Sequence, residues 1–411
     1  MFMKYKIARG RLYHTLFESL RYLLISIFNF RRHEKENVQI AHFEKKFSEF
    51  VDREHTIAFP FARTGLFFGL KALNLPIGSE IIMPPITIKG MLDVVLDLNL
   101  NPVYVDLEEN TFCFDLEDLK RKLNNKTKVI FITYLFGMVP DLAEIIKIAE
   151  KFKIILIEDF SQCLGGISKE LNVGKIGRLS IYSASSIKTL DCLGGGLVVT
   201  NDRFLAEKLI SYQGQLAKPK QLDLVNKALK NLVRNLLTSK IVFTIFTFWA
   251  IQVFYLINPT SALRQTGTRN MEPLDKLPKK WFRSFTNVQA KIGIEQLDKV
   301  NQKNSLRVSV AKKIIEHSVH HKFTKLENKN EHVYWQLATI TNDPRKIRNS
   351  FAKIGVDIAQ TSLSLICEST YSKAKEECPV ANKIYYRSIF IPCYPQISDT
   401  EIKRIVRYNL L

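Results

Sequence analysis

The sequence lacks the paired cysteines that stabilise many small secreted proteins. Its six cysteines are scattered over 411 residues without a C-x-x-C pair, which argues against a disulfide framework and against a structural zinc site. The N-terminus is basic and amphipathic and has no short apolar core followed by small residues, which argues against a secretory signal. We therefore expect reduced thiols, no metal site and a cytoplasmic location.

Acidic residues are also scarce. The chain has 40 Asp and Glu against 60 Lys and Arg, a formal net charge of +20. Such an excess indicates an anionic partner, which is nucleic acid, a phosphate-rich substrate or an acidic membrane surface. We expect no nucleic acid, because there is no zinc finger or RNP-like motif and the basic residues are dispersed. The hydrophobic share of 46% excludes a disordered or collagen-like chain.

The middle of the chain alternates short apolar runs with segments of helical period. Seven runs have the length of strands: residues 56–59, 80–83, 102–105, 128–133, 154–157, 179–182 and 197–200. Helical segments between and after them cover residues 64–73, 115–123, 142–152 and 204–212. Continuous apolar strands separated by helices predict an α/β fold with a mostly parallel sheet of seven strands, covered on both faces.

Polar residues follow three of these strands, where ligands bind in parallel sheets. They are residues 158–162, residues 183–188 and residues 62–65, the last opening a helix whose N-terminal amides suit a phosphate. Each segment alone has an ordinary structural explanation, such as a helix cap or a solvated lysine. Their order, with three glycines at 194–196 after Lys188, favours a ligand site.

These segments resemble the DegT/DnrJ/StrS family of pyridoxal-phosphate sugar aminotransferases, which have the type I fold of aspartate aminotransferase. Residues 158–165 are similar to the family's E-D-x-A-Q/H-x-x-G segment, and residues 183–196 to its S-F-x-x-x-K segment followed by three glycines. Residues 287–293, with Gln296 and Leu297, are similar to the helix that begins the family's C-terminal domain. The resemblance implies a large cofactor-binding domain and a smaller C-terminal α/β domain.

The resemblance assigns the catalytic roles to Lys188 and Asp159. Lys188 matches the amine that forms a Schiff base with the aldehyde of pyridoxal 5'-phosphate and later moves a proton. Asp159 matches the carboxylate that keeps the pyridine nitrogen protonated. One branch of the family has histidine at the lysine position and performs dehydration, so Lys188 favours amino transfer.

The resemblance also implies the residues that hold the cofactor. Gln162 matches the contact beside the ring's 3-hydroxyl group, Ser183 a hydroxyl on the phosphate, and Arg63 and Thr64 the other phosphate contact. Ile88 stands where the family often stacks an aromatic ring on the cofactor, and it would supply only an apolar lid.

The implied function is transfer of an amino group, by family habit from glutamate, to a keto-sugar that is nucleotide-linked or lipid-linked, in surface glycan or glycolipid biosynthesis. Because the family's active site forms at a subunit interface, we expect a homodimer. The family usually has Ser-Gly-Thr or Ser-Gly-Arg where this chain has Phe61-Ala62-Arg63. This departure, with Ile88, keeps an alternative open: a catalytically weak member that acts as a membrane-associated scaffold or regulatory binding protein.

Two segments exceed the family's usual plan. Residues 1–32 repeat leucine or isoleucine at spacings of three and four, at Leu12, Leu16, Leu20, Leu23 and Ile27. Residues 216–280 form an insert whose first half carries a second such stripe, at Leu222, Val225, Leu229, Leu232 and Leu236. We therefore divide the chain into an N-terminal helical segment (1–53), a large cofactor-binding domain (54–213), an apolar helical insert (214–283) and a small domain (284–411).

The second half of the insert, residues 241–263, contains no charged residue. About 20 apolar residues span a bilayer, but a single crossing would separate Lys188 from the C-terminal domain. The segment is therefore a buried helix, a re-entrant hairpin, an interfacial helix or a dimer-interface helix. The basic helices beside it favour an interfacial helix on the cytoplasmic face of an anionic membrane.

Overall fold

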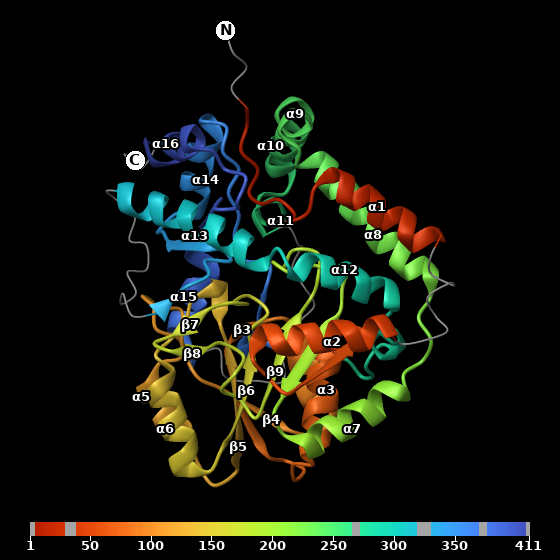
Figure 1. The fold of residues 1–411 in the computed structure, drawn as a ribbon. Coiled ribbons are helices and arrows are strands. Elements are labelled where there is room, and N and C mark those ends of the chain that lie inside the picture. Colours follow the sequence, from red (N-terminus) through yellow and green to blue (C-terminus); the bar gives the residue numbers. More distant parts are fainter. Residues whose placement is uncertain (1–4, 29–37, 265–271, 319–329, 370–375, 408–411) are drawn as a thin grey trace.

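The computed structural model describes residues 5–28, 38–264, 272–318, 330–369 and 376–407. Its centre is one sheet of seven strands in the order β1-β10-β9-β6-β5-β2-β4 (Figure 1). The strands are β1 (His55–Phe59), β2 (Glu80–Met83), β4 (Asn101–Tyr104), β5 (Thr127–Thr133), β6 (Ile155–Asp159), β9 (Leu179–Ser183) and β10 (Gly196–Thr200). Only β10 runs antiparallel to its neighbours in this sheet. All seven apolar runs predicted from the sequence are therefore confirmed as strands of a mostly parallel sheet.

Helices cover both faces of the sheet. They are α2 (Val38–Val51), α3 (Ala62–Leu73), α4 (Lys89–Asp97), α5 (Leu116–Lys122), α6 (Leu142–Phe152) and α7 (Arg203–Gly214). Gly69 of α3 faces Leu179 of β9, whereas the Phe47 ring of α2 lies 5.7 Å from that of Tyr182 on the same strand. Because side chains three apart on a strand point to opposite faces, α2 and α3 cover opposite faces.

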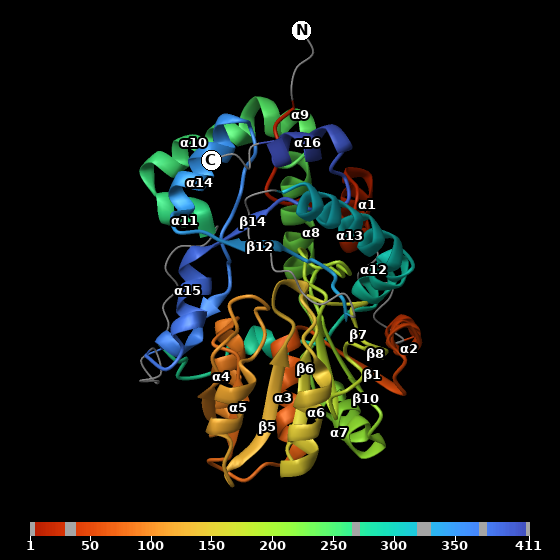
Figure 2. The ribbon, with the colours of Figure 1, turned by 90° about the vertical axis from the view of Figure 1, so that its left-hand side faces the viewer.

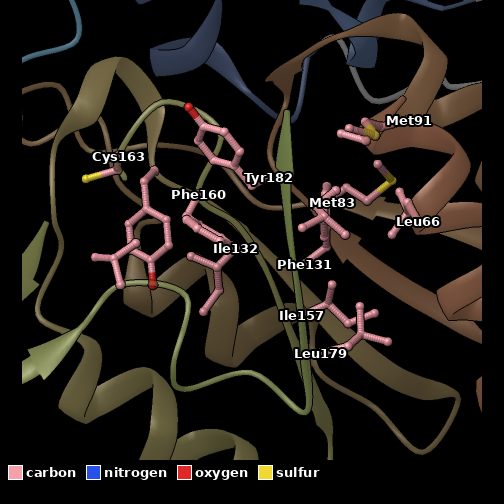
Figure 3. Close-up of a cluster of buried hydrophobic side chains, with 14 of the residues drawn as sticks. Leu66, Met83, Met91, Phe131, Ile132, Ile157, Phe160, Cys163, Leu179 and Tyr182 are labelled. Atoms are coloured by element: carbon pink, nitrogen blue, oxygen red, sulfur yellow. The ribbon is translucent and has the colours of Figure 1, made fainter. Parts of the chain in front are cut away.

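The main core fills the space between the sheet and these helices. Figure 3 shows part of it, where Phe131, Ile157 and Leu179 of neighbouring strands lie near Leu66 of α3. These side chains are at most 1% exposed, and burial of this kind stabilises a fold by about 1.5–3 kcal/mol per large apolar side chain.

The C-terminal part forms a smaller layer of helices over a two-stranded sheet. It comprises α12 (Asn287–Leu297), α13 (Val300–His317), β12 (Leu337–Ile340), α14 (Pro344–Lys353), α15 (Pro379–Arg387), β14 (Ser388–Ile391) and α16 (Asp399–Arg407), and β12 pairs with β14. It is joined to the large domain by β13 (Ser364–Leu365), which pairs with β3 (Ile86–Thr87). The N-terminal segment is joined to it as well, because Ile7 pairs with Val356.

The insert is helical throughout its described part. It holds α8 (Gln221–Leu237), a continuous helical stretch from α9 (Lys240–Val242) through a π-helical turn (Phe243–Thr247) to α10 (Phe248–Ile257), and α11 (Pro259–Arg264). The N-terminal helix α1 (Leu16–Phe28) lies along α8 (Figure 1). Figure 2 shows α9, α10 and α11 at the end of the molecule that also holds α14 and α16, opposite to α7.

Polar residues, rather than the leucine stripes, join α1 to α8. The buried side chains are Ser19, Tyr22 and Ser26 of α1 and Leu224, Ala228, Asn231 and Asn235 of α8. Many apolar residues of these helices and of the stretch from α9 to α10 are exposed, and we call them the apolar face: Leu16, Phe17, Leu20, Leu24, Ile27, Phe28, Leu222, Leu229, Val233, Leu236, Ile241, Ile245, Phe246, Trp249, Val253, Phe254, Leu256 and Ile257.

Within the described part of the chain, Lys240–Ile257 is the one helical segment long and apolar enough to cross a membrane, and 22% of it is buried. The alternative of a buried core helix for this segment is therefore wrong. The pairing of β13 with β3 joins chain from before and after the segment in one unit, which argues against a single crossing.

Candidate active site

The carboxyl ends of β6 and β9 bring two predicted site residues to one edge of the sheet. Asp159 is the last residue of β6 and Ser183 the last residue of β9, and the two strands are parallel neighbours. The amide of Ser183 donates to Oγ of Ser161 at 2.9 Å. This hydrogen bond fixes the segment after Asp159 against the end of β9.

The loop between β9 and β10 holds Lys188 and folds back over the strand ends. The amides of Cys192 and Gly194 both donate to the carbonyl of Ala184, at 3.0 and 3.1 Å. A Cβ on Gly196 would come within 2.2 Å of the Phe61 carbonyl carbon and the Ala62 nitrogen. Glycine at this position therefore lets the loop pass directly against the first residues of α3.

Lys188 is a buried amine. It is 8% exposed, and its Nζ lies 3.7 Å from the centroid of the Trp335 ring. Burial lowers the pKa of Lys188 to about 8, and the charge of Asp159 opposes this shift. Because the ordinary lysine pKa is about 10.4, far more of the neutral, nucleophilic form is present near neutral pH.

Asp159 is buried beside this amine. Its Oδ1 accepts from the amide of Ser161 at 3.0 Å. Burial raises the pKa of the Asp159 carboxyl, whereas the hydrogen bonds from Ser161 and the charge of Lys188 lower it. A carboxylate in such low-dielectric surroundings holds a nearby base in its protonated form.

Gln162 is fixed across the end of the neighbouring strand β5. Its Oε1 accepts from the amide of Phe136 at 2.9 Å. Phe136 lies in the short turn Leu135–Gly137 after β5 and has a φ of 60°. The structure therefore brings Asp159, Gln162, Ser183 and the Lys188 loop to the carboxyl ends of β5, β6 and β9.

Arg63 and Thr64 lie in the first turn of α3. The Cζ of Arg63 lies 4.5 Å from the ring centroids of both Phe61 and Trp281. The hydroxyl of Thr64 donates to the carbonyl of Trp281 at 2.7 Å, so its single proton is already used. Phe61, the N-cap, offers no side-chain hydrogen bond to the first amides of α3, which leaves this helix end suited to an anion.

Ile88 is half-buried and immediately precedes α4. The start of α4 lies against Arg63, because a Cβ on Gly90 would come within 2.8 Å of the Arg63 Cδ. Ile88 thus belongs to the same part of the molecule as the start of α3. Its proposed role as a lid stays a prediction.

Lys227 of α8 is a cation that sequence reasoning missed. Its Nζ lies 5.2 Å from the centroid of the Phe61 ring and 2.8 Å from where a Cβ on Gly194 would stand. Burial lowers the pKa of Lys227, the charges of Asp223 and Asp191 oppose this shift, and the charge of Arg63 adds to it. The insert therefore places a second cation beside Arg63. Its position follows from the packing of α8 against Gly194, which the sequence does not show.

Trp335 and Arg307 were also missed, because they come from the small domain. The Trp335 indole donates to the carbonyl of Ile187 at 3.0 Å. Arg307 is fully buried, and its guanidinium donates to the hydroxyl of Thr189 at 2.9 Å. Both residues hold the lysine loop from the side opposite to the sheet, and no spacing in the sequence connects them to it.

The insert and the N-terminal segment also contact the lysine loop. Asn231 of α8 donates to the carboxylate of Asp191 at 2.8 Å, and His14 lies 3.5 Å from the same oxygen. Burial raises the pKa of Asp191 to about 6 and lowers the pKa of His14 to about 4. The two added segments are therefore built into the site.

Pyridoxal 5'-phosphate fits the residues present. Lys188 and Asp159 supply a buried amine and a buried carboxylate close enough to shift each other's pKa. The first turn of α3 has cations on two sides, Arg63 and Lys227, and a glycine run that leaves no Cβ in the way. In the described residues, no group of three or more His, Cys, Asp or Glu is placed to hold a metal ion.

The chain is similar to known proteins of one family. A family model described as the DegT/DnrJ/EryC1/StrS aminotransferase family matches residues 33–228 and 278–408, so residues 1–32 and 229–277 lie outside the match. GDP-perosamine synthase of Escherichia coli O157:H7 is 24% identical over 367 residues, covering 88% of this chain and 87% of that protein.

Two solved structures have the same fold. Helicobacter pylori PseC, an aminotransferase involved in the biosynthesis of pseudoaminic acid, has a TM-score of 0.72 and 18% identity and covers 99% of this chain and 98% of its own. NtdA from Bacillus subtilis, solved with the cofactor PMP bound, has a TM-score of 0.70 and 20% identity and covers 95% of this chain and 81% of its own.

Proposed function

The chain belongs to the DegT/DnrJ/EryC1/StrS aminotransferase family, and we propose that it moves an amino group from glutamate to a keto-sugar used in surface glycan or glycolipid biosynthesis. Enzymes of this family are PLP-dependent aminotransferases. The observation that carries the proposal is the buried Lys188–Asp159 pair at the carboxyl ends of β6 and β9. GDP-perosamine synthase among the relatives, and PseC among the structures of the same fold, support a sugar as the acceptor.

The chain's own residues have separate tasks in this chemistry. Pyridoxal phosphate, when bound, supplies a reactive aldehyde and an electron-withdrawing ring. Lys188 would hold the cofactor through its aldehyde carbon and, once released, would move a proton between the substrate carbon that carries the amino group and that former aldehyde carbon. Asp159 would hold the proton on the ring nitrogen, and Trp335 and Ile187 would limit the access of water to the amine.

The direct test is transfer from glutamate to the enzyme. With glutamate and no acceptor, the cofactor-loaded protein should release one 2-oxoglutarate per active site. Added keto-sugars, nucleotide-linked or lipid-linked, should then sustain turnover. Lys188→Ala should lower the rate at least about 10³-fold, whereas Lys230→Ala, an exposed lysine of α8, should not change it. A protein that binds cofactor but releases no 2-oxoglutarate would support the scaffold alternative instead.

We propose that the enzyme is a homodimer. Ile187, next to the buried Lys188, is 43% exposed, and a partner subunit would cover such an apolar side chain beside a site that must exclude water. Sedimentation of the purified protein at micromolar concentration should give the mass of two chains, and a single-chain mass would reject the proposal.

We also propose that the enzyme docks on the cytoplasmic face of a membrane through the apolar face. Single exposed apolar side chains are ordinary, but neighbouring ones over several helices mark an interaction surface. Residues 224–263 contain no acidic residue, and Lys230 and Arg234 of α8 are exposed, which suits an anionic lipid surface. Near this surface, Nζ of Lys6 lies 5.1 Å from the Phe248 ring centroid.

A further inference from the structure

A cavity of about 590 Å³ lies beside the lysine loop. Ile187 and Trp335 line it at the active site, Arg11 and Tyr13 line it from the N-terminal segment, and Phe254 lines it from α10. Trp335 is shared with the active site, because its ring also contacts the amine of Lys188. The volume falls within the range of about 300–1,000 Å³ that is typical of ligand pockets.

The cavity wall has an excess of positive charge. Four arginines line it, Arg9, Arg11, Arg234 and Arg307, against one carboxylate, that of Asp357. Arg9 binds Asp357 through two hydrogen bonds of 2.6 and 2.7 Å. The other three arginines have no carboxylate partner in the part of the chain that the structure describes.

Two of these arginines, Arg11 and Arg234, are at least partly exposed and line the cavity. Nε of Arg11 is buried and has no acceptor among the described residues, and Arg234 is exposed at the cavity wall. Arg307 adds a fully buried charge whose partners are neutral oxygens, among them the Val333 carbonyl at 2.8 Å. Buried cations without counter-ions favour a strongly charged anion, and phosphate groups match arginine in charge and geometry.

The other end of the cavity is apolar. Phe243, Ile251 and Phe254 line it from the helical stretch that also carries the apolar face. Phe254 is 47% exposed, so the same ring contributes to the cavity and to the outer surface. A ligand with an anionic group at the arginines therefore has an apolar path to the apolar face.

We infer that this cavity binds a lipid-linked sugar phosphate or diphosphate. The phosphate groups contact Arg11 and Arg234, with the buried charge of Arg307 behind them, the sugar lies toward Trp335, and the lipid chain leaves along α10. The inference rests on the proposed function, because the active site beyond Trp335 is what acts on the sugar. A nucleotide-linked sugar offers the same phosphates. Its base is polar, however, so contact of the base with the apolar end of the cavity would add no hydrophobic contribution to the affinity.

Calorimetric binding to the cofactor-loaded full chain separates the two sources of phosphate. The probes are farnesyl diphosphate below its micelle concentration, UDP, GDP and inorganic diphosphate. Farnesyl diphosphate should bind at least about tenfold more tightly than the other three. Equal or tighter binding of UDP or GDP would overturn the inference in favour of a nucleotide-linked substrate.

Substitutions locate the binding. Arg234→Gln should weaken the binding of farnesyl diphosphate and of inorganic diphosphate alike, by about tenfold. Phe254→Ser should weaken only the binding of farnesyl diphosphate. Lys230→Gln, which removes a cation of α8 outside the cavity, should leave both unchanged. Unaltered binding in Arg234→Gln, with the protein still folded, would place the ligand elsewhere.

This assay contains neither amino donor nor membrane, so its failure is distinct from failure of the proposed function. Tight farnesyl diphosphate binding without glutamate turnover would reject the aminotransferase proposal alone. Glutamate turnover without farnesyl diphosphate binding would reject the lipid-linked substrate alone.

Discussion

At Lys188, burial and a neighbouring carboxylate act in opposite directions on the pKa. Burial is the larger effect and brings the pKa down to about 8, while Asp159 raises it. Covalent attachment of the cofactor requires the neutral amine. The pH at which Lys188 loses its proton therefore sets how fast the apoprotein takes up the cofactor.

We predict a rate of cofactor uptake that rises about tenfold per pH unit below pH 8 and levels off above it. In Asp159→Asn the carboxylate that raises the pKa of Lys188 is lost, so the plateau should begin at lower pH. Stopped-flow absorbance of apoprotein mixed with pyridoxal phosphate measures both profiles. A rate that still rises toward pH 10.5, as for an exposed lysine, would contradict this account of the site.

Lys227 is the residue that links the insert to the expected phosphate position. We predict that Lys227→Met raises the dissociation constant of pyridoxal phosphate about tenfold, because a charge-assisted hydrogen bond contributes about 1.5–3 kcal/mol. Lys230→Met, three residues along α8 and exposed, is the matched control and should bind normally. Equal affinity in both variants, measured by equilibrium dialysis, would show that Lys227 does not hold the phosphate.

At the scale of elements, the helical period is visible in the sequence, but the direction of each face is not. The leucine stripes of α1 and α8 predict amphipathic helices, and an ordinary soluble protein would turn those stripes inward. The structure instead buries Ser19, Asn231 and Asn235 between the helices, where Asn235 donates to Ser19 at 2.9 Å. That choice depends on partners distant in the sequence, so periodicity alone could not predict it.

Membrane docking should depend on the exposed residues of the helical stretch from α9 to α10. We predict that the protein floats with vesicles containing anionic lipid and that Phe246→Asp lowers the bound fraction about tenfold or more, because burial of a phenylalanine contributes about 1.5–3 kcal/mol. Phe246 is 62% exposed, and the matched control, Phe204→Asp of α7, alters a residue that is 78% exposed.

The Phe204→Asp control distinguishes binding through the apolar face from nonspecific hydrophobic adsorption to the vesicles. Phe204→Asp should float as well as the unaltered protein, because α7 lies at the opposite end of the molecule (Figure 2). If neither the unaltered protein nor Phe204→Asp floats, and Phe246→Asp turns dimers into monomers, the apolar face is a dimer interface.

For the whole molecule, the alternation of strands and helices predicted the α/β fold, and the family motifs predicted the location of Asp159, Ser183 and Lys188. Strand order and the reversed direction of β10 depend on pairings between segments that are distant in the sequence. The hydrophobic pattern of a single segment therefore cannot predict them. Trp335 and Arg307 reach the site for the same reason: the small domain folds back over the lysine loop. The net charge of +20 indicates an anionic partner. Part of the excess positive charge comes from lysines and arginines at the cofactor site, at the cavity and on α8.

The identity of the cofactor-binding lysine tests the central claim most directly. Cofactor-loaded protein reduced with borohydride, digested and analysed by mass spectrometry should carry the phosphopyridoxyl group on one peptide, at Lys188, and Lys188→Ala should carry none. A label on another lysine, or amino transfer that persists in Lys188→Ala, would contradict the account.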